Sequence, residues 1–140
     1  MEEKHIIAVY GTLRQGFGNH RIINDKPFHK TELTNFVMYS LGGFPAIVES
    51  NDDKDTIAVE LYEVDDITLA NVDSLEGYNR ESDHNPFYDC KEVEVYLGDG
   101  NYTTASIYVM HENSRYIKGA PVVKSGDWVK HTKTSRWMSL

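Results

Sequence analysis

The alternation of apolar and polar residues predicts a chain made mainly of short strands. Residues 5–10 read His-Ile-Ile-Ala-Val-Tyr, a β-rich run that stops at Gly11. Because the apolar residues of this run follow one another without a break, we expect its strand to be buried on both faces. Further strands are expected over 34–41, 46–49, 56–64, 91–97 and 103–110, the last two joined by a hairpin turn at 98–101.

One segment has the period of a helix instead. Asp65 or Asp66 is a suitable N-cap for a helix that runs to about Glu76, and Gly77 is a typical residue to end it. A short element and a turn are expected in the tail from Ile117. Many short strands with few helices favour a small α+β domain, spanning 1–140, around a closed or nearly closed sheet.

Glu76 is the most informative residue of the predicted helix. With about 100° per residue, Leu69, Val72 and Leu75 mark one apolar arc, and Glu76 falls between Leu69 and Val72. A carboxylate that points inward has a raised pKa, which suits a general acid/base. The alternative is that Glu76 lies in the frayed last turn and faces solvent, and the pattern alone favours this alternative by roughly two to one.

The loop Tyr10-Gly11-Thr12-Leu13 places several backbone N–H groups in a tight turn after the first strand. Such turns bind carboxylates and phosphates, and a glycine lets a ligand approach the backbone closely. The alternative is a turn that only connects two elements. No Gly-Lys-Ser/Thr follows, so the loop is not a P-loop. Arg14 could add positive charge here, but an exposed surface arginine is the simpler expectation.

Composition narrows the classes of function. The formal net charge of −8 argues against binding to nucleic acid or to anionic membranes. The single cysteine, Cys90, can form no internal disulfide, which favours a cytoplasmic location, and its strand-like surroundings favour a packed thiol over a nucleophile. The acidic N-terminus is unlike a signal peptide, and no apolar run approaches the ~20 residues that span a bilayer. The six histidines lack metal-ligand spacing.

Five segments of the chain are weak signals when taken one at a time, but together they are specific for one family. They are Val-Tyr-Gly-Thr-Leu-Arg at 9–14, followed by Gly16 and Asn19; Gly-Phe-Pro-Ala-Ile-Val at 43–48; Glu-Leu-Tyr-Glu-Val at 60–64, leading to Leu-Glu-Gly-Tyr at 75–78; Ala-Ser-Ile-Tyr-Val at 105–109; and Ser-Gly-Asp-Trp at 125–128. In this order and spacing they resemble the gamma-glutamylcyclotransferase-like family, particularly its short members near gamma-glutamylamine cyclotransferase. The resemblance covers most of the chain and reverses the odds against Glu76.

The resemblance implies a small mixed β-barrel with a few flanking helices and a cavity at one end. It implies that Glu76 is the catalytic glutamate. The substrate-binding residues that it implies, or that we add as wall candidates, are Tyr10, Gly11, Thr12, Leu13, Tyr78 and Tyr108. Ordinary packing is at least as good an explanation for the last two. The implied reaction releases 5-oxoproline from a small-molecule gamma-glutamyl amide by attack of the substrate's own α-amine. It needs no metal or organic cofactor, and we expect a monomer.

Two departures from the family pattern leave the substrate open. Asn79 stands where family members often carry proline, and Tyr88-Asp89 stands where they often carry Tyr-Arg, behind an extended loop over 81–87. One rival reading is a non-catalytic binding or regulatory module on the same fold. Another is a family enzyme that acts on a different acyl group. An open cavity beside Glu76 favours an enzyme, whereas a salt-bridged Glu76 in a filled cavity favours the module.

Overall fold

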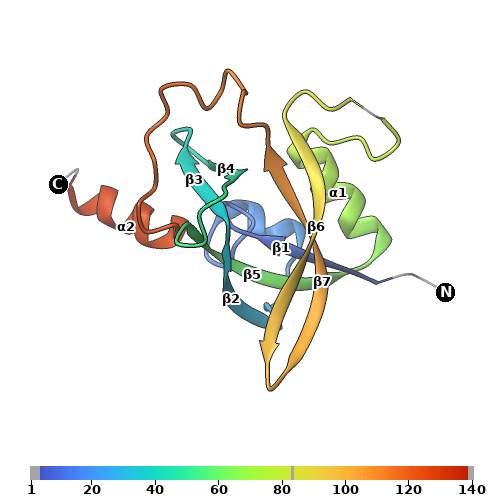
Figure 1. Cartoon of the computed structure of the whole chain (residues 1–140). Coiled ribbons are helices and arrows are strands. Elements are labelled where there is room, and N and C mark those ends of the chain that lie inside the picture. The colour runs from blue at the N-terminus through green and yellow to red at the C-terminus, as the bar shows by residue number, and fades with distance from the viewer. Residues whose placement is uncertain (1–3, 83, 139–140) are drawn as a thin grey trace.

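A five-stranded mixed sheet forms the body of the molecule in the computed structural model, which describes residues 4–82 and 84–138 (Figure 1). Its strand order is β2-β5-β1-β7-β6. The central strand β1 runs antiparallel to β5 and parallel to β7. The strands are β1 His5–Val9, β2 His29–Thr34, β5 Thr56–Val64, β6 Tyr88–Gly98 and β7 Asn101–Met110.

The unbroken apolar run of β1 is buried on both faces, as predicted. Ala8 belongs to one hydrophobic cluster, whereas Ile7 and Val9 belong to a second cluster on the opposite side of the strand. Successive side chains of a strand point to opposite faces, so a strand between two cores needs apolar residues at every position. The chain that leaves β1 therefore starts from a rigid, fully covered position.

A second, two-stranded sheet pairs β3 Phe36–Ser40 with β4 Pro45–Glu49. β4 packs against β7, and β3 packs against β5. The tail adds to β3, because Val123 N–H donates to the carbonyl of Met38 at 2.8 Å and Ser40 N–H donates to that of Pro121 at 2.9 Å. The two sheets form a curled half-barrel rather than one ring of strands (Figure 1). The predicted α+β class with barrel-like strands is confirmed.

Helix α1, Asp66–Glu76, has the predicted ends. The side chain of Asp65 accepts a hydrogen bond from Thr68 N–H at 2.8 Å, and Gly77 ends the helix in a left-handed conformation with φ 65°. Leu69 and Val72 are buried. The prediction that Leu75 shares their buried arc is wrong: it is 41% exposed, because the last turn of the helix borders the cavity described below rather than the core.

The other elements agree less closely with the sequence pattern. The 3₁₀ helix η1, Gly18–Ile22, follows the predicted Tyr10–Leu13 loop. The predicted short element of the tail is the eleven-residue helix α2, Trp128–Met138. Strand β2 was not predicted, because polar residues fill most of its positions and Leu33 alone is fully buried. No helix in the described part of the chain is long and apolar enough to cross a membrane.

Candidate active site

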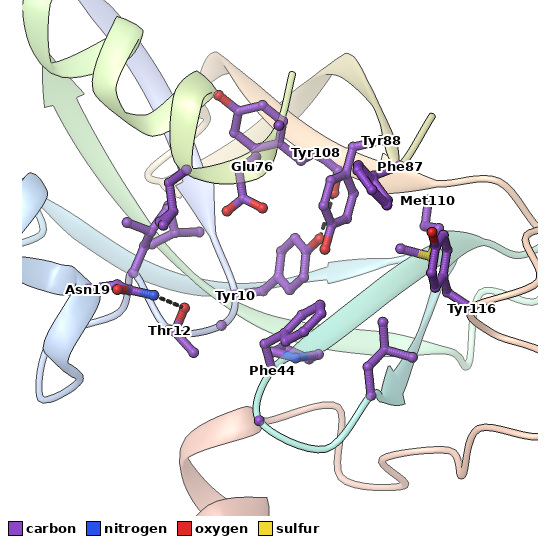
Figure 2. A pocket seen from close by; sticks show the side chains of 18 of the residues that line it. Tyr10, Thr12, Asn19, Phe44, Glu76, Phe87, Tyr88, Tyr108, Met110 and Tyr116 are labelled. Atoms are coloured by element: carbon purple, nitrogen blue, oxygen red, sulfur yellow. Dashed lines mark hydrogen bonds between the residues drawn. The ribbon is translucent and has the colours of Figure 1, made fainter. Parts of the chain in front are cut away.

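A cavity of about 480 Å³ opens where the end of α1, the loop after β1 and the turn between β3 and β4 meet (Figure 2). The predicted site residues Tyr10 to Leu13, Glu76 and Tyr108 all line it. Tyr78 is not among the lining residues. Its ring packs edge-on against that of Tyr108, with the centroids 5.7 Å apart. Every predicted site residue except Tyr78 therefore lines the cavity, and Tyr78 packs against one that does.

Glu76 points from the last turn of α1 into this cavity, toward Tyr10 (Figure 2). Within the described chain its carboxylate makes no hydrogen bond and no ion pair. Burial, helped by the negative charge of Asp73 three residues earlier, raises the pKa of Glu76 to about 7. The inward orientation is the one observed, and it gives a group able to accept and return a proton near neutral pH.

The loop that faces Glu76 is held by contacts at both of its ends. The hydroxyl of Tyr10 donates to the backbone carbonyl of Tyr108 at 2.7 Å, and Asn19 Nδ2 donates to Thr12 Oγ1 at 2.9 Å. In the residues that the structure describes, the N–H groups of Gly11, Thr12 and Leu13 donate to no protein acceptor. Three adjacent backbone donors in a cavity wall are suited to bind a carboxylate or a developing oxyanion.

Arg14 is buried rather than exposed, so the expectation of a surface arginine is wrong. Its Nε donates to Glu60 Oε2 and its Nη1 to Asp127 Oδ1, both at 2.8 Å. Asp127 also accepts from Val129 N–H at the start of α2. Arg14 thus ties the cavity loop to β5 and to the C-terminal helix. It does not line the cavity, and its guanidinium group is engaged with these two carboxylates.

Asp73 is a buried site residue that the sequence analysis missed. It accepts a hydrogen bond from the hydroxyl of Tyr108, and Arg80 Nε lies 2.7 Å from its Oδ2. Residues three apart on a helix share a face, so the spacing of Asp73 from Glu76 was the available signal. The charge of Asp73 helps to raise the pKa of Glu76, and its hydrogen bond anchors Tyr108, which lines the cavity.

Aromatic residues that the sequence analysis did not assign complete the wall. Tyr88 lines the cavity, and burial, followed by the nearby Glu76 carboxylate, raises the pKa of Tyr88 so that its hydroxyl keeps its proton. Phe87 also lines the cavity, which places the end of the 81–87 loop at the site. Further lining residues are Phe44, Met110 and Tyr116. Cys90 is not among the lining residues, and burial raises the pKa of its thiol.

Nowhere in the described residues do three or more His, Cys, Asp or Glu side chains gather in a group able to hold a metal ion. The polar groups that line the cavity include the Glu76 carboxylate, the backbone of the Tyr10–Leu13 loop and the hydroxyls of Tyr88 and Tyr116.

Gly11→Ala is expected to damage the site through contact with the neighbouring sheet. A Cβ at position 11 would lie 2.8 Å from both Cγ and Cδ of Pro45, so the cavity loop must move away from β4. Overpacking of this kind costs about 1–3 kcal/mol. We expect a lower melting temperature and a fall in kcat/KM carried mainly by KM. Gly18→Ala, where no atom lies within 4 Å of the added Cβ and which does not line the cavity, is the matched control. Equal kinetics for the two variants would contradict this account.

A half-barrel whose end cavity is lined by one partly buried carboxylate and by the Tyr10–Leu13 loop has the features of a small-molecule enzyme. A family model described as "Gamma-glutamyl cyclotransferase, AIG2-like" matches residues 7–130. The chain belongs to this family.

Individual relatives agree with this assignment. A putative gamma-glutamylcyclotransferase of Vibrio cholerae is 31% identical over 131 residues, covering 89% of this chain and 96% of the relative. The gamma-glutamylcyclotransferase family protein YtfP of Escherichia coli is 31% identical over 128 residues, covering 91% of this chain and 98% of YtfP. The solution structure of E. coli ytfP matches with a TM-score of 0.61 at 29% identity, covering 91% of this chain and 98% of that one.

A third relative carries a specific activity in its name. The gamma-L-glutamyl-butirosin B gamma-glutamyl cyclotransferase of Niallia circulans is 30% identical over 98 residues, covering 69% of this chain and 61% of the relative. With homologues of this kind over most of its length, the chain is a gamma-glutamylcyclotransferase-like enzyme.

Proposed function

We propose that this enzyme releases 5-oxoproline from a gamma-glutamyl amide, with Glu76 as the general acid/base. The observation that carries the proposal is the Glu76 carboxylate, which faces an open cavity beside the Tyr10–Leu13 loop with a pKa of about 7. The unfilled cavity and the unpaired carboxylate, within the described residues, favour this function over a non-catalytic module.

The reaction needs no nucleophile from the protein. Glu76 takes a proton from the substrate's α-ammonium group, and the freed nitrogen attacks the γ-carbonyl carbon to close a five-membered ring. Glu76 passes this proton to the amide nitrogen, the bond between that nitrogen and the carbon breaks, and the amine leaves. The ring nitrogen then gives up its second proton, which Glu76 transfers to the departing amine, so that the products are 5-oxoproline with a neutral amide N–H and an ammonium ion. Holding the substrate folded, with its nitrogen against its carbonyl, lowers the barrier by several kcal/mol.

The backbone donors of the Tyr10–Leu13 loop hold the substrate's charge in this scheme. The N–H groups of Gly11, Thr12 and Leu13 bind the α-carboxylate or the oxyanion that develops on the γ-carbonyl. The buried Arg14 keeps their loop in place through Glu60 and Asp127.

The test of the function is the release of 5-oxoproline by the purified protein from a panel of gamma-glutamyl amino acids and gamma-glutamyl amines.

Asp73→Asn is expected to shift the pH dependence of this activity. The reaction starts from the Glu76 carboxylate. We therefore expect kcat/KM to rise with pH and to level off above the pKa of Glu76, which is about 7. Removal of the Asp73 charge favours the carboxylate form of Glu76. The midpoint of the rise in kcat/KM therefore moves to lower pH, by roughly 0.5–1 pH units. Asparagine can still accept the hydrogen bond from Tyr108. The measurement is a kcat/KM profile from pH 5 to 9.

Asp89→Asn is the control for this profile. Asp89 pairs with His111 at 3.4 Å, and neither residue lines the cavity. For this variant we expect the midpoint of the rise in kcat/KM to stay at the wild-type pH. If the midpoint for Asp73→Asn also stays at the wild-type pH, or moves to higher pH, the role assigned to Asp73 is contradicted.

A further inference from the structure

We propose that the amine released from the substrate carries an uncharged, apolar substituent, and that before release this substituent lies against a wall formed by Phe44, Phe87 and Tyr116. This inference rests on the proposed function, because it concerns the part of a gamma-glutamyl amide that leaves. It names a substrate class: gamma-glutamyl derivatives of alkyl or aryl-alkyl amines, in preference to those of diamines.

The wall is built from three segments that are far apart in the sequence. Phe44 lies in the turn between β3 and β4, Phe87 lies just before β6, and Tyr116 follows β7. Figure 2 shows the three side chains around the cavity, with Glu76 on the far side of Tyr10. The rings of Phe87 and Tyr116 are in contact, with their centroids 5.3 Å apart. Three aromatic side chains that meet at a cavity with one reactive carboxylate provide an apolar surface for a ligand.

These rings are not buried by the protein itself. Phe44 is 46% exposed, Phe87 is 37% exposed and Tyr116 is 39% exposed. Clustered exposed aromatics of this kind indicate a binding surface, because covering them with an apolar ligand removes their contact with water. The apolar part of a leaving amine is the ligand that the position of Glu76 brings against them.

The charges around the wall disfavour a substituent that carries a positive charge of its own. Glu76 is the only charged side chain among the described residues that line the cavity, and in the proposed reaction its carboxylate is engaged with the α-ammonium. A cation further along would lose hydration without gaining a partner. Arg115 adds repulsion, because its guanidinium lies 5.1 Å from the centroid of the Tyr116 ring.

The wall also has room for a chain of several carbons. Leu41, Phe44 and Tyr116 are shared with a second, more open hollow of about 550 Å³. That hollow is bordered by Lys118, which would repel a cationic end group. An extended apolar amine can therefore pass from Glu76 along the aromatic wall toward the second hollow.

The sharpest test is a pair of substrates of the same shape. Gamma-glutamyl-pentylamide and gamma-glutamyl-(4-aminobutyl)amide differ only in a terminal methyl group against a terminal ammonium group. For the wild type we expect kcat/KM for 5-oxoproline release to be at least about tenfold higher with the pentylamide. Phe87→Ala is expected to reduce this preference through a higher KM for the pentylamide. Tyr102→Ala, which removes an exposed aromatic ring from the distant β6–β7 hairpin, is expected to leave the preference unchanged.

A binding measurement separates this inference from the reaction. The monopentylamide and mono(4-aminobutyl)amide of glutaric acid lack the α-amine and cannot cyclise, so calorimetry with the wild type reports binding alone. Tighter binding of the monopentylamide, weakened by Phe87→Ala, supports the wall even if no 5-oxoproline is formed from any substrate. Equal affinity, a preference for the aminobutyl compound or no binding of either overturns it, whether or not the protein proves to be a cyclotransferase.

Discussion

Replacing Glu76 with glutamine is expected to lower kcat/KM for 5-oxoproline release by about 10²–10⁴-fold. Glutamine keeps the size and shape of the side chain but can neither take the proton from the α-ammonium nor return it to the leaving amine. The effect should appear in kcat, because the cavity and the Tyr10–Leu13 loop that bind the substrate are unchanged. The measurement is steady-state kinetics on the best gamma-glutamyl substrate of the panel.

Stability measurements show whether this loss reflects chemistry or unfolding. The pKa of Glu76 is about 7 in the folded protein against an ordinary value of 4.5, so between these pH values the folded state binds more protons. Stability from this group is present at low pH and is lost as the pH rises through 7. Glu76→Gln should therefore match the wild type near pH 4.5 and exceed its free energy of unfolding by of the order of 2 kcal/mol at pH 8. A well-folded variant within tenfold of wild-type activity would remove Glu76 from the mechanism.

Arg14→Met is expected to reduce the free energy of unfolding by about 3–5 kcal/mol. The carboxylate of Glu60 is 2% exposed, and its partners are Arg14, the hydroxyl of Tyr62 at 2.6 Å and the N–H of Gln15 at 2.9 Å. Burial alone would raise the pKa of Glu60, but these hydrogen bonds outweigh burial and lower it. Methionine fills much of the same space and leaves that carboxylate buried without its cation. Denaturant unfolding at pH 7 measures the loss.

The pH dependence of this loss identifies its cause. Without Arg14 the pKa of Glu60 rises, so acidification neutralises the buried charge and the deficit of Arg14→Met narrows as the pH falls from 7 toward 4. The double variant Arg14→Met/Glu60→Gln should recover most of the lost stability at pH 7, since it removes the fully buried unpaired charge, while the less buried Asp127 keeps its hydrogen bond from Val129 N–H. A deficit that is constant with pH and unchanged by Glu60→Gln would show that lost packing, and not the ion pair, explains the effect.

The parts of the fold that local pattern determines could be predicted from the sequence. The unbroken apolar run of β1 required two covering cores, and β5 was predicted with its observed bounds. Asp65 and Gly77 marked the ends of α1 through hydrogen bonding and backbone conformation, both of which depend on residues close in sequence. Strand β2 could not be predicted, because most of its residues are polar and its pattern does not differ from that of a loop.

The residues of the candidate site could be predicted only through the resemblance to the gamma-glutamylcyclotransferase-like family. Glu76 and the Tyr10–Leu13 loop were assigned in this way, since the helical pattern alone favoured a solvent-facing glutamate. The burial of Arg14 could not be foreseen, because its partner Asp127 is 113 residues away. The aromatic wall likewise joins Phe87 to Tyr116 across the length of the β6–β7 hairpin. Contacts of this kind depend on the topology of the sheets and not on any local period.

The central claim is that the substrate's own nitrogen, and not water, attacks the γ-carbonyl. Turnover in water enriched in ¹⁸O, followed by mass spectrometry of the products, tests it directly. Our account predicts 5-oxoproline without ¹⁸O, formed in equal amount with the released amine and absent with Glu76→Gln. Glutamate carrying ¹⁸O in its γ-carboxylate, formed in place of 5-oxoproline, would contradict the account and would assign Glu76 to the activation of water.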